Sequence, residues 1–195
     1  MTTVLYGGAF DPVHVGHVFI GREALRLLAP CQLILIPTGV PNPVFCKELQ
    51  ASDEDRLAML RLAFTGITGV SISDIELRRV PRTSYFVDTL EGLLPTLQTN
   101  KLFLLLGEDQ LASFHVWHRY EEILRHVELR YVPRASRQAS SQNSVLAEKL
   151  FDINPFDGLS SSLIRNRLAN DLPVYGLVPE VVAAYIARHS LYRQS

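Results

Sequence analysis

Short apolar runs alternate with longer segments of helical periodicity along this chain. The runs predict strands at residues 4–6, 33–36, 70–75 and 102–106, and the segment 128–132 is also expected to be extended. The segments between them predict helices at 16–28, 53–64, 85–94 and 118–125. Strands that are apolar throughout, instead of alternating apolar and polar positions, are typical of a parallel sheet with helices on both faces. The pattern therefore predicts an α/β fold with a Rossmann-like, doubly wound parallel sheet, which binds ligands at the carboxyl ends of its strands.

Length and composition fit one domain. The chain has 195 residues, of which 47 % are hydrophobic, enough to fill one core. We see no repeat and no second domain, so residues 1–195 are expected to form one. The longest apolar runs are far shorter than the ~18 residues of a membrane span, and the N-terminus has no basic region of a signal peptide. With only two cysteines, Cys31 and Cys46, the sequence predicts a cytoplasmic protein with free thiols and no membrane partner.

The charge balance argues against a general nucleic-acid binder. The formal net charge is −1, whereas such proteins usually carry a basic excess that releases counterions from phosphates. Arginines and tyrosines interleave between residues 119 and 137, but Glu121, Glu122 and Glu128 dilute their charge, which favours a solvated helix face over an RNA surface. Residues 134–144, rich in Ser, Gln and Arg, predict a mobile loop. Small anionic ligands remain possible, because a local cluster of cations suffices for them.

The junction between the first predicted strand and the first predicted helix carries candidate chemistry. Gly7 and Gly8 allow a sharp turn and a close approach of a ligand to the backbone N–H groups. His14 and His17 flank Gly16, and side chains three apart near a helix start point the same way. Two imidazoles would thus lie beside a helix N-terminus, which favours bound phosphate. The alternative is a turn with two incidental histidines; the spacing fits neither a P-loop nor a Gly-x-Gly-x-x-Gly loop, and a zinc site lacks a third ligand nearby.

A second candidate anion site lies near the C-terminal end of the chain. Ser160, Ser161 and Ser162 precede a helical pattern that includes Arg165 and ends near Asn170. Serines at a helix start are common N-caps. Three in a row leave two hydroxyls free after capping, and a guanidinium one turn later can offer a bidentate fork to phosphate. The residues alone leave both readings open.

These two segments resemble the signatures of one superfamily. His14-Val15-Gly16-His17 is similar to the His-x-Gly-His signature of the nucleotidyltransferases, and residues 160–165 resemble the Ser-Ser-x-x-Ile-Arg signature of its small adenylyltransferases. The resemblance implies a nucleotidyltransferase-type fold with a small helical C-terminal part. It implies that His14, His17 and Arg165 are catalytic, by stabilising charge at the α-phosphate and clamping the triphosphate. The ATP contacts that it implies come from Gly7, Gly8, Phe10, His14, His17, Lys47, Gly107, Asp109, Ser160, Ser161, Ser162 and Arg165.

Three further segments resemble the nicotinate mononucleotide adenylyltransferase branch of that superfamily. They are residues 83–90, similar to Thr-Ser-Tyr-Thr-x-x-Thr-Leu, residues 107–109, similar to Gly-x-Asp, and the segment around Trp117. The resemblance implies that Asp109 contacts a ribose and that the indole of Trp117 stacks on a pyridine ring. The mononucleotide contacts that it implies come from Ser84, Tyr85, Thr89 and Trp117. The residues alone also allow Trp117 to be a core residue and Asp109 to be a helix cap.

Two positions depart from the pattern of that branch. Phe86 stands where the family usually has a threonine, which removes a hydroxyl. The loop after the second predicted strand runs from Pro41 to Lys47 without the histidine of the usual Pro-Pro-His-Lys. Lys47 is one of only three lysines in the chain, and it could still reach the phosphates.

The resemblance implies transfer of the adenylyl group of ATP to nicotinate mononucleotide, with release of pyrophosphate, in NAD biosynthesis. Mg²⁺ would bind through the phosphate oxygens and water, so no protein metal site is expected. Alternative acceptors are nicotinamide mononucleotide and phosphopantetheine, and a non-catalytic nucleotide sensor is an alternative from another class. The sequence leaves the oligomeric state open.

Overall fold

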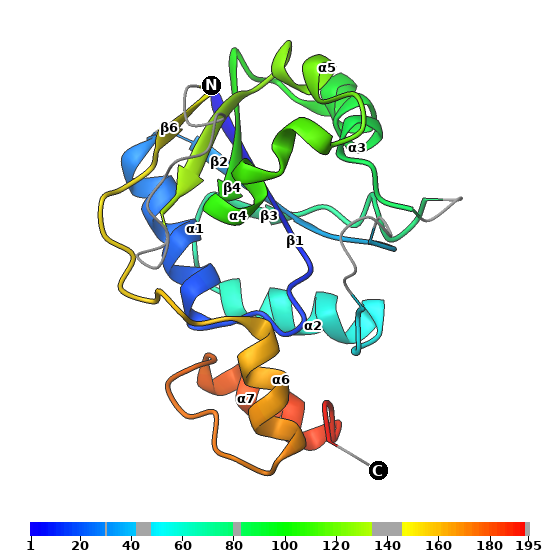
Figure 1. The fold of residues 1–195 in the computed structure, drawn as a ribbon, viewed down its shortest axis with the longest axis vertical. Coiled ribbons are helices and arrows are strands. Elements are labelled where there is room, and N and C mark those ends of the chain that lie inside the picture. The colour runs from blue at the N-terminus through cyan, green and yellow to red at the C-terminus, as the bar shows by residue number, and fades with distance from the viewer. Residues whose placement is uncertain (30, 42–47, 80–82, 134–145, 194–195) are drawn as a thin grey trace.

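One parallel sheet organises the fold. The computed structural model describes residues 1–29, 31–41, 48–79, 83–133 and 146–193. Within these ranges six strands pair in parallel in the order β3-β2-β1-β4-β5-β6 (Figure 1). They are β1 (Thr2–Gly8), β2 (Cys31–Pro37), β3 (Val70–Ile72), β4 (Lys101–Gly107), β5 (Glu128–Val132) and β6 (Ala147–Lys149). The direction of winding reverses between β1 and β4, so a ligand crevice is expected at their carboxyl ends.

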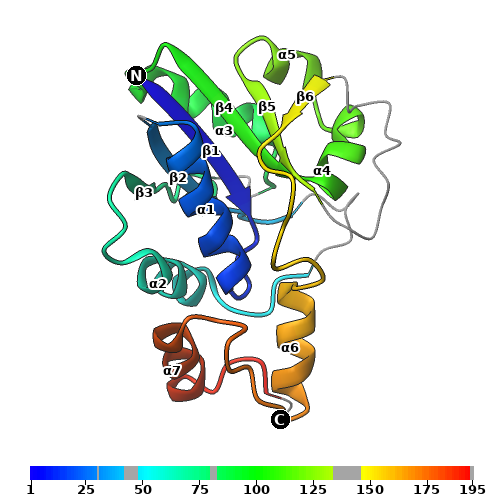
Figure 2. The ribbon, with the colours of Figure 1, turned by 90° about the vertical axis from the view of Figure 1, so that its left-hand side faces the viewer.

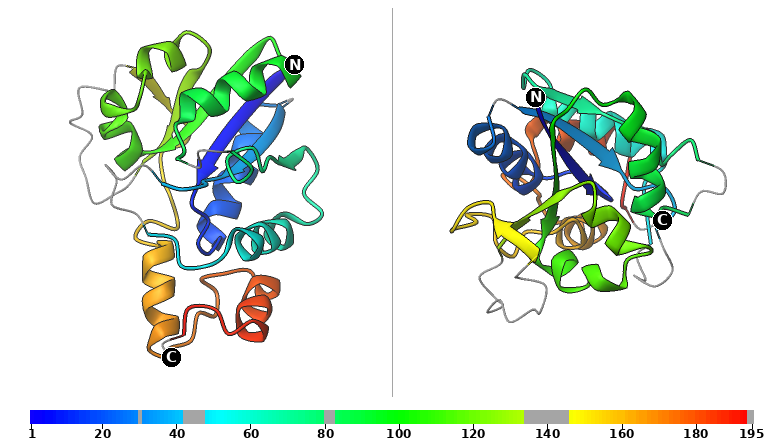
Figure 3. Two further views of the ribbon diagram at one scale, coloured as in Figure 1. Left: turned by 90° about the vertical axis from the view of Figure 1, so that its right-hand side faces the viewer. Right: turned by 90° about the horizontal axis from the view of Figure 1, so that it is seen from above.

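Helices cover both faces of this sheet, as the sequence predicts (Figure 3). Successive residues of β1 point to opposite faces: Val4 and Tyr6 pack in one buried cluster with residues of α1, α2, α6 and α7, and Leu5 packs in another with α3, α4 and α5. The helices are α1 (Val15–Leu27), α2 (Asp53–Phe64), α3 (Phe86–Leu93), α4 (Glu108–Ala112), α5 (Tyr120–Leu124), α6 (Ser161–Ala169) and α7 (Glu180–Arg188). Burial on both faces explains why the central strands are apolar at every position.

The C-terminal helices lie beyond the carboxyl end of β1 rather than on a face of the sheet (Figures 1 and 2). α7 packs against α2, and the Tyr185 hydroxyl donates a hydrogen bond to Asp55 of α2 at 2.9 Å. α6 begins next to the loop that follows β1, because the Ser161 hydroxyl donates to the Pro12 carbonyl oxygen at 2.9 Å. This placement brings the two candidate anion sites of the sequence to one end of the sheet.

Several elements match their predicted bounds, and others differ for local reasons. α2 spans Asp53–Phe64 as predicted, with the Ser52 hydroxyl accepting from the Asp55 N–H at 3.0 Å. β3 is shorter than predicted, and β6, the edge strand Ala147–Lys149, was not predicted at all. α5 begins at Tyr120 instead of residue 118, because Arg119 adopts a left-handed backbone with φ of 53°. The predicted mobile loop at 134–144 lies outside the described residues.

Two expectations concern the chain as a whole. No helix in the described ranges combines the length and the apolar character that crossing a bilayer demands. The assignment of residues 1–195 to one domain stays a prediction.

Candidate active site

Two buried charged side chains fix the loop between β1 and α1 through hydrogen bonds to the backbone. Arg56 is fully buried and donates to the Ala9 carbonyl oxygen at 2.8 Å. Asp11 is 1 % exposed, and its carboxylate accepts from the backbone N–H groups of Gln50 at 2.8 Å and Ala51 at 3.1 Å. Charge-assisted hydrogen bonds of this kind fix a backbone more firmly than neutral ones. The loop is therefore a fixed platform.

The two histidines cap α1 reciprocally. His14 is the N-cap residue, and its Nδ1 accepts from the His17 backbone N–H at 3.3 Å. His17 Nδ1 accepts in turn from the His14 backbone N–H at 3.2 Å. The two rings stack, with centroids 3.6 Å apart, and the Phe10 ring meets His17 edge-on at 5.0 Å. Two ring orientations are thus fixed by the helix start itself.

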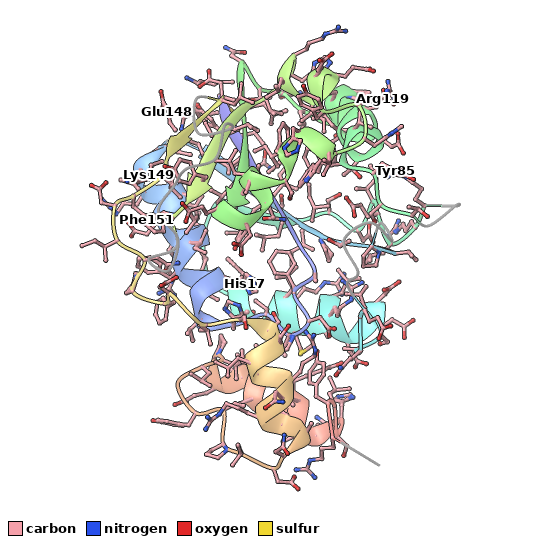
Figure 4. All side chains as sticks on the ribbon, viewed as in Figure 1. His17, Tyr85, Arg119, Glu148, Lys149 and Phe151 are labelled. Atoms are coloured by element: carbon pink, nitrogen blue, oxygen red, sulfur yellow. The ribbon has the colours of Figure 1, made fainter. Side chains whose placement is uncertain are left out.

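This capping decides which ring nitrogen carries the proton. A neutral imidazole has one N–H and one acceptor nitrogen. Because Nδ1 of each ring accepts a backbone hydrogen bond, the proton of the neutral ring is on Nε2. His14 and His17 therefore each present an Nε2–H donor, and His17 lies between the sheet and α6 (Figure 4).

The serine segment forms the facing half of the site. The Ser160 hydroxyl caps α6 by accepting from the Leu163 N–H at 3.2 Å, as the capping alternative expects. Arg165 reaches back across the chain and donates from Nη1 to the Asp11 carbonyl oxygen at 2.8 Å. Its buried Nε has no hydrogen-bond partner within the described part of the chain. Arg165 also lines the cavity that joins the two halves, so its guanidinium places positive charge at that wall.

One cavity of about 530 Å³ joins both halves. Residues at the start of α1 and at the start of α6 line it, so the positive ends of two helix dipoles converge on the same space. The predicted ATP-site residues that line it are Gly7, Gly8, Phe10, His14, His17, Gly107, Asp109, Ser160, Ser161, Ser162 and Arg165. Two sequence motifs from opposite parts of the chain therefore share one cavity, whose chemistry suits a polyphosphate.

A second cavity of about 260 Å³ adjoins the first. Gly7, Gly8 and Asp109 line both. Its outer wall is aromatic and comes from Tyr85, Phe86, Trp117 and His118 (Tyr85 is labelled in Figure 4). The carboxyl end of β1 thus separates an anion-binding cavity from one suited to a flat ring.

Comparison with known proteins agrees with this geometry. The sequence model of the cytidylyltransferase-like family matches residues 5–167. A Dehalococcoides mccartyi protein named probable nicotinate-nucleotide adenylyltransferase is 38 % identical over 100 % of this chain and 98 % of its own length. A protein of the same name from Bordetella avium is 39 % identical over 97 % and 96 %. The chain belongs to the nicotinate-nucleotide adenylyltransferase family.

Solved structures agree on the fold of this family. Plasmodium falciparum nicotinic acid mononucleotide adenylyltransferase complexed with NaAD superimposes with a TM-score of 0.81 at 16 % identity, covering 98 % of this chain and 97 % of the other. The same enzyme complexed with APC gives a TM-score of 0.79 at 14 % identity, over 98 % and 96 %. The Rossmann-like nucleotidyltransferase fold expected from the sequence is therefore confirmed.

Most residues that the family resemblance implied line one of the two cavities. Ser84, Tyr85 and Trp117 line the second. The Trp117 ring also contacts Phe86 at 5.9 Å and Phe114 at 5.2 Å between centroids, so it forms part of the cavity wall and part of the packing behind it. Asp109 is not the helix cap, because Gly107 takes the N-cap position of α4. Lys47 lies outside the described residues.

The structure places Thr89 differently from Ser84, Tyr85 and Trp117. The Thr89 side chain is fully buried and does not line the second cavity. Its hydroxyl donates to Glu76 Oε1 at 2.9 Å and accepts from Arg79 Nη1 at 3.1 Å. Glu76 in turn accepts from the Gly39 N–H at 3.3 Å and lines the cavity. Thr89 therefore supports the cavity floor through Glu76.

Sequence reasoning missed several residues that line the cavities. Glu76, Ser113 and His118 line the second, and Gln110 lines both. Gln110 caps α4 by accepting from the Gly107 N–H at 3.0 Å, a contact that its spacing of three from a strand-end glycine could have suggested.

Arg119 ties the Trp117 turn to α3. Its guanidinium contacts Glu91 at 2.8 Å and Glu122 at 2.6 Å. The hydrogen bond with Glu122, and to a smaller extent the one with Glu91, raises the pKa of Arg119 above its usual value. The same contact with Arg119 lowers the pKa of Glu122. The arginine is solvent-exposed, as expected for this part of the chain, and it holds the aromatic wall against the helix that carries Phe86 (Figure 4).

Proposed function

We infer that this protein transfers the adenylyl group of ATP to nicotinate mononucleotide, giving nicotinate adenine dinucleotide and pyrophosphate in NAD biosynthesis. The observation that carries this function is the pair of adjoining cavities at the carboxyl end of β1. One presents histidine Nε2–H donors, two helix N-termini and Arg165, and the other presents an aromatic wall. The names of the full-length relatives point to the same reaction.

In this mechanism a phosphate oxygen of the mononucleotide attacks the α-phosphorus of ATP in line. A new bond joins that oxygen to the α-phosphorus, and the bond from the α-phosphorus to the bridging oxygen breaks, so pyrophosphate leaves with the electron pair. The attacking phosphate is already ionised, so no protein base is needed. Catalysis then comes from positioning, which can supply ~7–11 kcal/mol, and from donors to the developing charge, ~3–4 kcal/mol each.

His14 and His17 would be the donors to the α-phosphate, because both line the first cavity and their Nδ1 atoms already accept from the backbone. Arg165 and the N-terminus of α6 would hold the β- and γ-phosphates, since both line the first cavity. Asp109 lines both cavities, a position suited to the ribose near the reacting atoms. Tyr85 and Trp117 would hold the pyridine ring, as aromatic faces stack on flat rings.

Mg²⁺ would accompany ATP. In the described ranges no group of three or more His, Cys, Asp or Glu residues is placed to hold a metal ion. We expect the Mg²⁺ ion to keep phosphate oxygens and water as its ligands and to need no dedicated protein site. When bound, the ion supplies neutralisation of phosphate charge.

A direct assay separates the candidate reactions. The purified chain is incubated with MgATP and, in turn, nicotinate mononucleotide, nicotinamide mononucleotide and phosphopantetheine, and pyrophosphate release and product mass are measured. We expect the highest kcat/KM with nicotinate mononucleotide, a dinucleotide product, and loss of activity with excess EDTA. ATP binding without turnover on any acceptor would favour a nucleotide sensor, and preference for another acceptor would refute the assignment.

A further inference from the structure

The last residues of the described chain reach the active-site loop. After α7 ends at Arg188, the tail folds back, and Ser190 and Tyr192 adopt left-handed backbone angles, with φ of 51° and 66°. Residues other than glycine adopt this region only where the surroundings fix them. Here the Tyr192 hydroxyl donates a hydrogen bond to Asp11 Oδ1 at 2.7 Å, a contact that spans 181 positions of sequence.

Asp11 connects that tail to both walls of the first cavity. Its carboxylate holds the backbone N–H groups of Gln50 and Ala51, and Gln50 lines the cavity. Its carbonyl oxygen accepts from Arg165 Nη1 at 2.8 Å, and Arg165 lines the cavity from α6. A shift of Asp11 would therefore move the support on which the guanidinium rests.

The Tyr192 hydroxyl is an important donor to this carboxylate. Asp11 is 1 % exposed, so water contributes little, and a buried carboxylate that loses a donor is destabilised in its position. Burial raises the pKa of the Tyr192 hydroxyl well above its usual value, and the negative charge of the neighbouring Asp11 carboxylate raises it further. The phenol thus stays protonated and able to donate at neutral pH.

We propose that Tyr192 is a positioning residue for adenylyl transfer, which acts through Asp11 on Arg165. The inference rests on the proposed function. The tail does not touch the phosphates; it fixes the loop carbonyl that orients the guanidinium toward them. The C-terminal segment is in this sense part of the ATP site.

The chain offers a matched control. Tyr185, on α7 in the same C-terminal part, also donates its hydroxyl to an aspartate, Asp55 of α2, at 2.9 Å, and it lines neither cavity. Tyr192→Phe and Tyr185→Phe therefore remove the same group from the same part of the protein, but only the first leads to Asp11. We expect Tyr192→Phe to lower kcat/KM for ATP about tenfold with the KM for nicotinate mononucleotide within about twofold. Tyr185→Phe is expected to keep both parameters within about twofold.

A double-mutant cycle tests the route through Arg165. In an Arg165→Lys background the guanidinium fork is gone, so Tyr192→Phe is expected to add less than about twofold to the loss. Equal activity of the two phenylalanine variants, or full additivity with Arg165→Lys, would overturn the proposal. So would a loss shared by both substrates that follows the melting temperature, because that result indicates a purely structural tyrosine. An inactive wild type would instead refute the proposed function.

The wild-type protein gives a second readout that does not depend on how the variants fold. Coupling between two sites is reciprocal, so a saturating non-hydrolysable ATP analogue is expected to slow amide hydrogen exchange in residues 189–193. Exchange in the tail that is the same with and without the analogue would count against the proposal.

Discussion

The orientation of His14 leads to a prediction in which stability and activity respond to different substitutions. Nδ1 caps α1, and the residue lines the first cavity. Asparagine places an oxygen near the position of Nδ1 and is among the best N-cap residues, so His14→Asn keeps the cap and loses the Nε2–H donor. Glutamine can place its NH₂ near the position of Nε2 but is a poor cap, so His14→Gln keeps a donor and loses the cap.

The magnitudes follow from these roles. Loss of one donor to a developing oxyanion costs about 3–4 kcal/mol, which is about 10²–10³-fold in kcat. Loss of an N-cap costs about 1 kcal/mol of stability. Both variants lose the stacking of His14 on His17, whose centroids are 3.6 Å apart, so this term cancels in the comparison. We expect His14→Asn to be the more stable variant by about 1 kcal/mol and His14→Gln to be the more active by at least tenfold.

Urea unfolding and initial rates of pyrophosphate release measure the two quantities on the same preparations. An asparagine variant within a few-fold of wild-type kcat would show that Nε2 is not a donor to the reaction. A glutamine variant as stable as the asparagine variant would show that Nδ1 does not cap the helix. Either result refutes the tautomer argument.

Two further substitutions test the second cavity. Thr89→Val removes a fully buried hydroxyl that is hydrogen-bonded to the charged Glu76 and Arg79 side chains. We expect the free energy of unfolding in urea to fall by about 2–3 kcal/mol and the KM for nicotinate mononucleotide to exceed that of the wild type. Thr89→Ser, which keeps the hydroxyl, is the control, and a valine variant as stable as the wild type would contradict this hydrogen-bond network. Trp117→Leu is expected to raise the KM for nicotinate mononucleotide about tenfold with the KM for ATP unchanged, because aromatic pairs contribute about 0.5–1.5 kcal/mol beyond burial. Reduced stability with an unchanged KM would assign Trp117 to the core alone.

The local sequence by itself determined the helices and strands that carry caps or continuous apolar runs. The bounds of α2 were predictable because Ser52 supplies the cap and three acidic residues fill the first turn. The parallel sheet was predictable because strands buried on both faces are apolar at every position. The two candidate anion-binding segments could also be recognised, since a strand-end glycine pair with histidines and a serine run before an arginine are contiguous patterns. The strand Ala147–Lys149 was not predictable, because three polar and small residues at a sheet edge carry no apolar pattern.

What only the tertiary structure decided is which distant groups meet. Nothing in the local sequence says that Arg165 rests on the Asp11 carbonyl or that Tyr192 reaches its carboxylate, because these contacts depend on where α6 and the tail pack. Thr89 matched a binding motif, yet the pitch of α3 turns it inward to Glu76 and leaves Tyr85 at the cavity. Sequence periodicity determines which face of a helix or strand is buried, whereas long-range packing determines which other element covers that face. The residue types of the candidate site therefore occur in local sequence motifs, and the fold brings those motifs together into one site.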